Sequence, residues 1–189
     1  MNITKKMLFS VALASTTLTG SAVFANHHMA SNPMVGGAAM YPAKTIVENA
    51  SAAPNLTTLV AAVKAAGLVE TLASPGPFTV FAPTNAAFDK LPDGTVATLV
   101  KPENKATLTK ILTYHVVAGK LTASDIVSAI KAGGGKASLT TVAGEKITAR
   151  LSGKNVIITD AKGGQSAVTT VDVMQSNGVV HVIDSVLLP

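Results

Sequence analysis

The chain has 189 residues, with 15 Lys and Arg, 10 Asp and Glu, and neither Cys nor Trp. A chain of this length can bury enough apolar surface to fold as one domain without disulfide bonds. From Lys44 to Lys162 the basic residues are spread singly, and aromatic residues make up only 4% of the chain, which argues against a nucleic-acid partner and against sugar binding on aromatic platforms.

The first 25 residues have the pattern of a secretory signal peptide. Lys5 and Lys6 precede an apolar run at 7–18, which is followed by small residues that end at Ala25. The run is shorter than the roughly 20 residues that a membrane-spanning helix needs, so we expect cleavage after Ala25 and no permanent membrane span. Cleavage leaves 13 basic and 10 acidic residues in a protein secreted to the periplasm or the extracellular space.

Residues 26–42 lack hydrophobic periodicity and contain Gly and Pro, which predicts a flexible arm ahead of a single domain at 43–189. Cleavage after Ala25 would place His28 third from a free amine, in the segment Asn26-His27-His28. The amine, two backbone amides and the imidazole can form a square-planar nitrogen set, which suits Cu(II) or Ni(II). We favour the alternative of a tail without a ligand, so no metal is assigned.

The spacing of apolar residues predicts three helices. The first follows Asn55, the expected N-cap, and ends at Gly67. The second begins at Pro102, because the missing amide hydrogen of proline costs nothing at a helix start. The third covers 122–131, where Thr122 and Asp125 form a capping box. The residues expected to face the core are Leu56, Leu59, Val60, Val63, Leu108, Ile111, Leu112, Ile126 and Ile130.

Runs of β-branched and aromatic residues predict the strands. Phe78–Phe81 lies between the first two helices, and four further runs, at 147–151, 156–158, 168–173 and 179–183, follow the third helix. Helices first and strands later, with hairpin-length turns, predict a segregated α+β domain.

Three segments, in this order, resemble the fasciclin (FAS1) family. They are Phe-Thr-Val-Phe-Ala-Pro-Thr-Asn-Ala-Ala-Phe at 78–88, Tyr-His-Val-Val at 114–117 and Asn-Gly-Val-Val-His-Val-Ile-Asp at 177–184. The resemblance covers residues 42–189. It implies a β-wedge or sandwich of mostly C-terminal strands, covered by helices from the N-terminal half. It also implies a non-enzymatic adhesion or interaction module, of the kind that bacterial members secrete as single domains.

The residues of these segments also have roles that follow from their chemistry. Pro83 ends a strand, and Thr84 or Asn85 can accept amide hydrogen bonds at the start of a short helix. Phe88 then turns back to the core. The β-branched run around His181 is expected in the interior of the sheet.

Two family positions associated with adhesion carry over to this sequence. The tyrosine-histidine motif falls on Tyr114 and His115. Instead of a direct contact with a partner, we favour a buried His115 whose ring nitrogens bond to the backbone. Such a histidine would order the binding surface from beneath. An acidic motif falls on residues 170–174, of which only Asp172 and Met174 match. An Asp172 that simply points to solvent is the alternative there.

We therefore expect a monomer that binds a cell-surface or extracellular-matrix protein, or a surface polymer. No cofactor and no catalytic residue is assigned, because the sequence has no Cys nucleophile, no Gly-x-Ser-x-Gly turn and no histidines at zinc-ligand spacing. The alternative is an envelope protein that binds a small ligand or a metal at the helix-sheet junction or through its arm. Convergent polar groups in a pocket would favour that alternative, and an apolar patch near Asp172 would favour adhesion.

Overall fold

The computed structural model describes residues 32–189. The predicted signal peptide, its cleavage after Ala25 and the Asn26-His27-His28 nitrogen set lie outside the described residues. Residues 32–189 belong to one compact unit.

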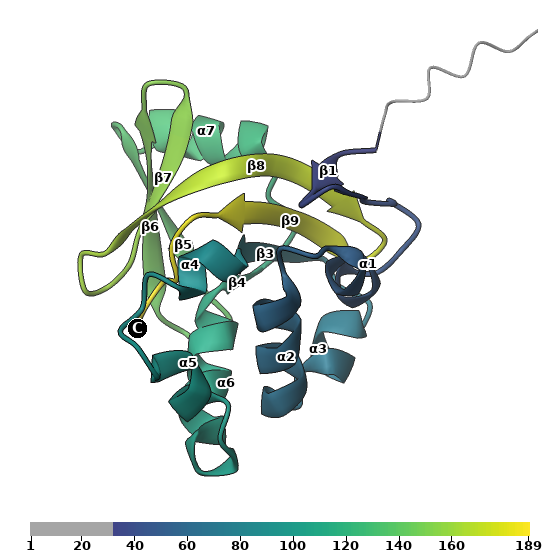
Figure 1. Ribbon diagram of the computed structural model, residues 1–189. Helices are drawn as coiled ribbons and strands as arrows, with labels where there is room; N and C mark the ends of the chain where they lie inside the picture. Colours follow the sequence, from purple (N-terminus) through teal and green to yellow (C-terminus); the bar gives the residue numbers. More distant parts are fainter. Residues whose placement is uncertain (1–31) are drawn as a thin grey trace, which may run out of the picture. The chain divides into compact units, whose positions relative to one another are not determined.

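Strands and helices of this unit follow one another along the chain as shown in Figure 1. They are β1 (Met34–Val35), β2 (Ala38–Ala39), α1 (Ile46–Ala52), α2 (Thr57–Ala66), α3 (Val69–Ala73), β3 (Phe78–Pro83), α4 (Asn85–Phe88), α5 (Thr95–Leu99), a 3-10 turn η1 (Pro102–Asn104), α6 (Lys105–Tyr114), β4 (Val116–Ala118), α7 (Ala123–Ala132), β5 (Lys136–Thr140), β6 (Lys146–Ser152), β7 (Asn155–Thr159), β8 (Gln165–Gln175) and β9 (Gly178–Ile183).

The main sheet has the strand order β4-β3-β9-β8-β7-β6-β5. Its strands pair antiparallel except for β3 and β9, which run parallel. A bridge between Val117 and Thr141 links the two ends of the order, so the sheet is nearly closed. Most strands come from the C-terminal half and most helices from the N-terminal half, which confirms the predicted α+β class.

The parallel pairing brings together two segments that lie about 100 residues apart in the sequence. Phe78 of β3 is opposite Gly178 of β9, and Pro83 is opposite Ile183. A Cβ on Gly178 would lie 2.0 Å from the carbonyl oxygen of Phe78, so only glycine fits this approach. The first and third family-like segments are therefore adjacent strands, as the resemblance implies.

The apolar core has two parts. One lies between α1, α2, α6 and the strands β3, β8 and β9, and includes Leu59, Leu112 and Val180. The other lies between α7 and β5–β7, and includes Ile130 and Ile147. Figure 1 shows α2, α3, α5 and α6 along one side of the strands and α7 at the far end of the sheet.

The beginning of α2 differs from the prediction. Its N-cap is Leu56, without a side-chain hydrogen bond, so Asn55 as N-cap is wrong. Asn85 of α4 reaches across instead: its Oδ1 accepts from the Thr58 amide at 3.0 Å, and its Nδ2 donates to Thr57 Oγ1 at 2.9 Å. The predicted end at Gly67 is confirmed, because Gly67 has a left-handed φ of 74°.

The other predicted helix signals are confirmed. Pro102 opens η1 directly before α6, which buries the expected Leu108, Ile111 and Leu112. Thr122 is the N-cap of α7 and forms the capping box with Asp125. Thr84 caps the short α4, and Phe88 is buried as expected.

The flexible arm predicted for residues 26–42 is wrong for its described part. β1 and β2 pair as a hairpin, and the hairpin residues Val35 and Met40 are buried with exposed fractions of 3% and 2%. These two side chains belong to the same core cluster as Ile46 of α1 and Leu59 of α2, and their burial favours the folded position of the hairpin.

Candidate functional site

Tyr114 lies at the last turn of α6 and is fully buried. Its hydroxyl donates to the Lys146 carbonyl at 3.3 Å and accepts from the Ala161 amide at 2.9 Å. Burial raises the pKa of this hydroxyl, so it stays protonated. Tyr114 joins α6 to β6 and to the turn after β7, and it is not accessible to a partner.

His115 follows Tyr114 and faces the other part of the core. Its Nδ1 donates to the Ile111 carbonyl at 2.8 Å, and its Nε2 accepts from the Leu187 amide at 3.0 Å. Burial lowers the pKa of His115 to about 4, because the charged ring would lose its water. His115 is a neutral core histidine with both nitrogens engaged, which is the alternative that the sequence favoured.

A β-bulge interrupts β8 at the acidic motif. Thr170 pairs with Val182 and Val173 pairs with Val180, so Val171 and Asp172 together oppose the single residue His181. Asp172 has a φ of +56°, and it alone among the described non-glycine residues has a positive φ. Aspartate tolerates this left-handed conformation better than most side chains, because its carboxylate can bond to nearby amides.

Hydrogen bonds hold the bulge in place. Asp172 Oδ1 accepts from the Ala123 amide, in the first turn of α7, at 2.7 Å. The Asp172 amide donates to His181 Nδ1 at 3.3 Å, and His181 Nε2 donates to the Leu121 carbonyl at 2.9 Å. The His181 ring stacks on Phe81 with ring centres 5.6 Å apart. Asp172 is thus a structural carboxylate, and the prediction that it merely points to solvent is wrong.

The burial of His181 confirms the predicted interior position and lowers the pKa of its ring. With Nδ1 accepting and Nε2 donating, the ring is in its neutral form.

The bulge leaves one apolar side chain on the surface. Val171 is 43% exposed, next to the half-buried Asp172 and two residues before the buried Val173. Met174 is also half-buried. Val171, Asp172 and Met174 of β8 are therefore all at least partly exposed, whereas Tyr114 and His115 are buried and are not part of the surface.

The sequence did not indicate that Val171 of the acidic motif is exposed, or that Leu121 and Ala123 contact this region. A valine in a strand gives no sign of exposure, and contacts between β8 and the start of α7 span about 50 residues. The available signal was Asp172 itself, because aspartate is disfavoured within strands and so indicates an irregular position.

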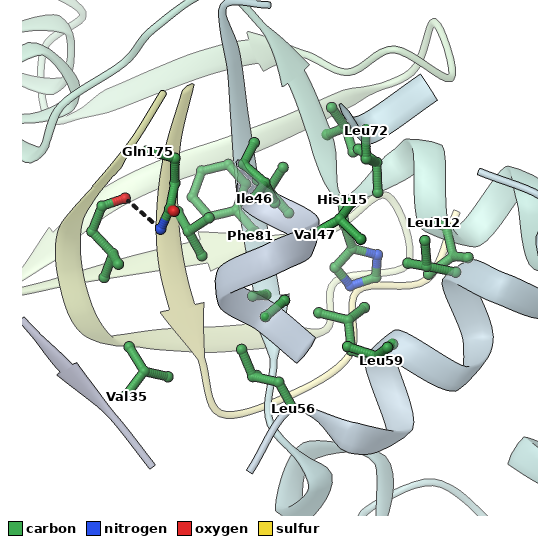
Figure 2. Close-up of a pocket in the computed structure, with 18 of the residues that line it drawn as sticks. Val35, Ile46, Val47, Leu56, Leu59, Leu72, Phe81, Leu112, His115 and Gln175 are labelled. Carbon is green, nitrogen blue, oxygen red and sulfur yellow. Dashed lines mark hydrogen bonds between the residues drawn. The ribbon is translucent and has the colours of Figure 1, made fainter. Parts of the chain in front are cut away.

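An apolar cavity of ≈ 40 Å³ lies at the helix-sheet junction, beneath α1 and the β1–β2 hairpin. Figure 2 shows the aliphatic side chains of Ile46, Val47, Leu56 and Leu59 around it, with His115 and Gln175 at its wall. The polar groups there are engaged: Gln175 Nε2 donates to the Val173 carbonyl at 3.4 Å, and Asn49 Nδ2 donates to Gln175 Oε1. The cavity offers no set of convergent polar groups to a ligand.

Within residues 32–189, no group of three His, Asp or Glu side chains is placed to hold a metal ion. The helices of that same range are all too short or too polar to cross a bilayer. Neither His115 nor His181 has a free ring nitrogen for a catalytic pair, because all four ring nitrogens form hydrogen bonds with backbone groups.

Known proteins resemble this chain over most of its length. The model of the Fasciclin domain matches residues 54–189. Protein sll1483 of Synechocystis sp. is 53% identical over 156 residues, which cover 82% of this chain and 79% of that protein. Immunogenic protein MPB70 of Mycobacterium bovis is 35% identical in an alignment that covers 98% of this chain and 97% of that protein.

A solved structure has the same fold. It is the FAS1 domain pair from the insect cell adhesion molecule Fasciclin I, which matches with a TM-score of 0.68 and 21% identity, over 77% of this chain and 51% of that one. At this identity the likeness concerns the fold, and it confirms the predicted architecture.

Proposed function

The chain belongs to the fasciclin domain family, and on that premise we propose that it is a secreted, non-enzymatic interaction module. Its partner is a cell-surface, matrix or envelope component. Cleavage near Ala25 releases the module, and mass spectrometry of the exported protein tests that step. A mass that does not correspond to a chain beginning near Asn26 would contradict this cleavage. The same measurement with one equivalent of Cu(II) would test the Asn26-His27-His28 nitrogen set.

The bulge of β8 is the observation that carries this proposal. A non-glycine residue in the left-handed region costs roughly 1 kcal/mol or more, and such residues concentrate at functional sites. In this protein the residue with the left-handed conformation is Asp172, and its neighbour Val171 is exposed at the surface. We infer that a partner packs against Val171 and its surroundings.

Asp172 acts in this proposal as a positioning residue. Its carboxylate bonds to the start of α7, and its amide bonds to His181 in the neighbouring strand. These two bonds fix the backbone on which Val171 stands. Tyr114 and His115 contribute from beneath, by holding α6 against the strands and the C-terminal segment.

An attachment assay on a pair of valine variants tests the surface. The variant Val171→Ser removes the exposed apolar contact, and Val142→Ser is its matched control, because Val142 is a valine with a similar exposure of 47% that lies elsewhere. We expect Val171→Ser to lose most of its attachment to cells or matrix, and Val142→Ser to attach like the unmodified protein.

Both variants change exposed side chains, so both should fold, and circular dichroism checks this. Equal attachment by Val171→Ser and Val142→Ser would refute the bulge as the contact surface. Failure of the unmodified protein to attach to any surface tested would refute the adhesion proposal as a whole.

Small-ligand binding, the other class considered, has a candidate location in the cavity beneath α1. Pockets for metabolites measure about 300–1,000 Å³, whereas this cavity measures ≈ 40 Å³ and has an apolar lining. A metabolite would fit only after α1 or the hairpin moved away. The size of this cavity therefore argues against the helix-sheet junction as a metabolite site.

A further inference from the structure

The far end of the sheet presents a second surface, which we name the cationic face. It is the side of β5, β6 and β7 that points away from α7 (Figure 1). The opposite side of these strands carries Ala137, Ile147 and Ile158 and packs on α7. The residues of the cationic face are Lys136, Ser138, Thr140, Lys146, Thr148, Arg150, Ser152, Asn155, Ile157 and Thr159.

Strand register places like charges side by side on this face. Lys136 of β5 is directly opposite Arg150 of β6, and Lys146 lies two pairs further along, opposite Thr140. Directly opposed like charges destabilise a sheet. Arg150 is held in place by a hydrogen bond from its Nη2 to Gln165 Oε1 at 2.6 Å, across β7.

No carboxylate neutralises these cations among the residues of the face. Glu145, just before β6, forms its ion pair with Lys110 of α6, with Nζ and Oε1 2.7 Å apart. Asp160, just after β7, is buried, and its two oxygens accept from the amides of Lys162, Gly164 and Leu188. The positive charge of the face is therefore available to an external anion.

Hydroxyl groups fill the space between the cations. Ser138, Thr148 and Thr159 form one cross-strand row, and Ser152 opposes Asn155 in another. These side chains both donate and accept hydrogen bonds, as sugar hydroxyls do. The face has no aromatic residue on which a base could stack, which favours an acidic sugar polymer over a nucleic acid.

We propose that the cationic face binds an acidic polysaccharide. Carboxylates of the polymer pair with Lys136, Arg150 and Lys146, and its hydroxyls bond to the rows of Ser and Thr. This inference rests on the proposed function, because it names the chemistry of one partner, and it adds a contact surface to the bulge of β8.

Binding to immobilised polygalacturonate tests the proposal, with neutral dextran as the control polymer. We expect the unmodified protein to bind polygalacturonate more tightly than dextran, and the affinity to fall as salt rises from about 50 to about 500 mM. The double variant Lys136→Gln/Arg150→Gln should bind about tenfold more weakly, because it loses two ion pairs. It should unfold at the same or a higher temperature, since the like-charge pair is gone.

A charge-matched control separates this face from net charge. The double variant Lys101→Gln/Lys105→Gln removes the same two charges from exposed residues at η1 and α6, and it should bind within about twofold of the unmodified protein.

Three results would overturn the inference: equal loss in both double variants, equal binding to dextran, or tighter binding to single-stranded DNA of matched charge than to polygalacturonate. Attachment through Val171 is measured separately. If the unmodified protein does not bind polygalacturonate but still attaches through Val171, the cationic face is refuted and the proposed function stands.

Discussion

Replacing His115 with glutamine should change how stability depends on pH. The ordinary pKa of histidine is 6.5, and in the folded protein burial lowers the pKa of His115 to about 4. Below about pH 6.5 the unfolded chain therefore binds a proton that the folded protein excludes. The stability contributed by the neutral ring is complete above the unfolded pKa, falls as the pH drops through it, and levels off below about pH 4.

The magnitude follows from the difference between the two pKa values. One pKa unit corresponds to about 1.4 kcal/mol, so the full effect is on the order of 3 kcal/mol, and about 2 kcal/mol is lost between about pH 7.5 and about pH 5. The neutral ring also accepts from the Leu187 amide, a bond that protonation would break.

Urea unfolding followed by circular dichroism measures this effect, because the chain has no Trp for fluorescence. The free energy of unfolding of the unmodified protein should fall about 2 kcal/mol more than that of His115→Gln over this pH range. His181 is present in both proteins and its contribution cancels in the comparison. Parallel pH profiles for the two proteins, or an NMR titration of His115 with a midpoint near 6.5, would show that burial does not lower the pKa of His115.

Two further substitutions test long-range contacts of the fold. Asn85→Ala removes the acceptor of the Thr58 amide and should lower the free energy of unfolding by about 1–2 kcal/mol. Its control, Asn104→Ala, loses only a bond to the Thr98 carbonyl and should lower the free energy of unfolding by less. Equal losses in the two variants would contradict the role of Asn85 as the cap of α2. Gly178→Ala places a Cβ 2.0 Å from the Phe78 carbonyl oxygen and should prevent stable folding. In the control Gly144→Ala the new Cβ has no atom within 4 Å, so this variant should lose only about 1 kcal/mol of stability, because alanine disfavours the positive φ at this position. Comparable urea midpoints for these two glycine variants would argue against the close parallel pairing of β3 and β9.

Local signals in the sequence predicted the elements that depend on neighbouring residues. The capping box at Thr122 and Asp125 and the helix end at Gly67 are both present, because each requires only residues within one helical turn. The strands observed at 78–83 and 178–183 contain the runs predicted at 78–81 and 179–183, because β-branched residues beside turn residues are also a local signal.

Features that depend on distant residues could not be predicted. Asn55 has the composition of an N-cap, yet Asn85 takes that role from the strand-to-helix corner. Residues 34–40 lack periodicity, so the sequence gives no local sign of structure there. The burial of Val35 and Met40 in the core that they share with α1 and α2 orders these residues. The role of Asp172 likewise depends on Ala123 and His181, which no local pattern connects to it.

The attachment of two Asp172 variants shows whether a partner recognises the shape of the β8 bulge. Asp172→Asn keeps an oxygen that can accept from the Ala123 amide and a side chain that tolerates the left-handed conformation, whereas Asp172→Ala loses both. With both variants folded by circular dichroism, we expect Asp172→Asn to attach within about twofold of the unmodified protein and Asp172→Ala to lose most of its attachment. Equal loss in both variants would mean that a partner binds the carboxylate charge itself, and full attachment by Asp172→Ala would mean that the bulge is not the contact surface.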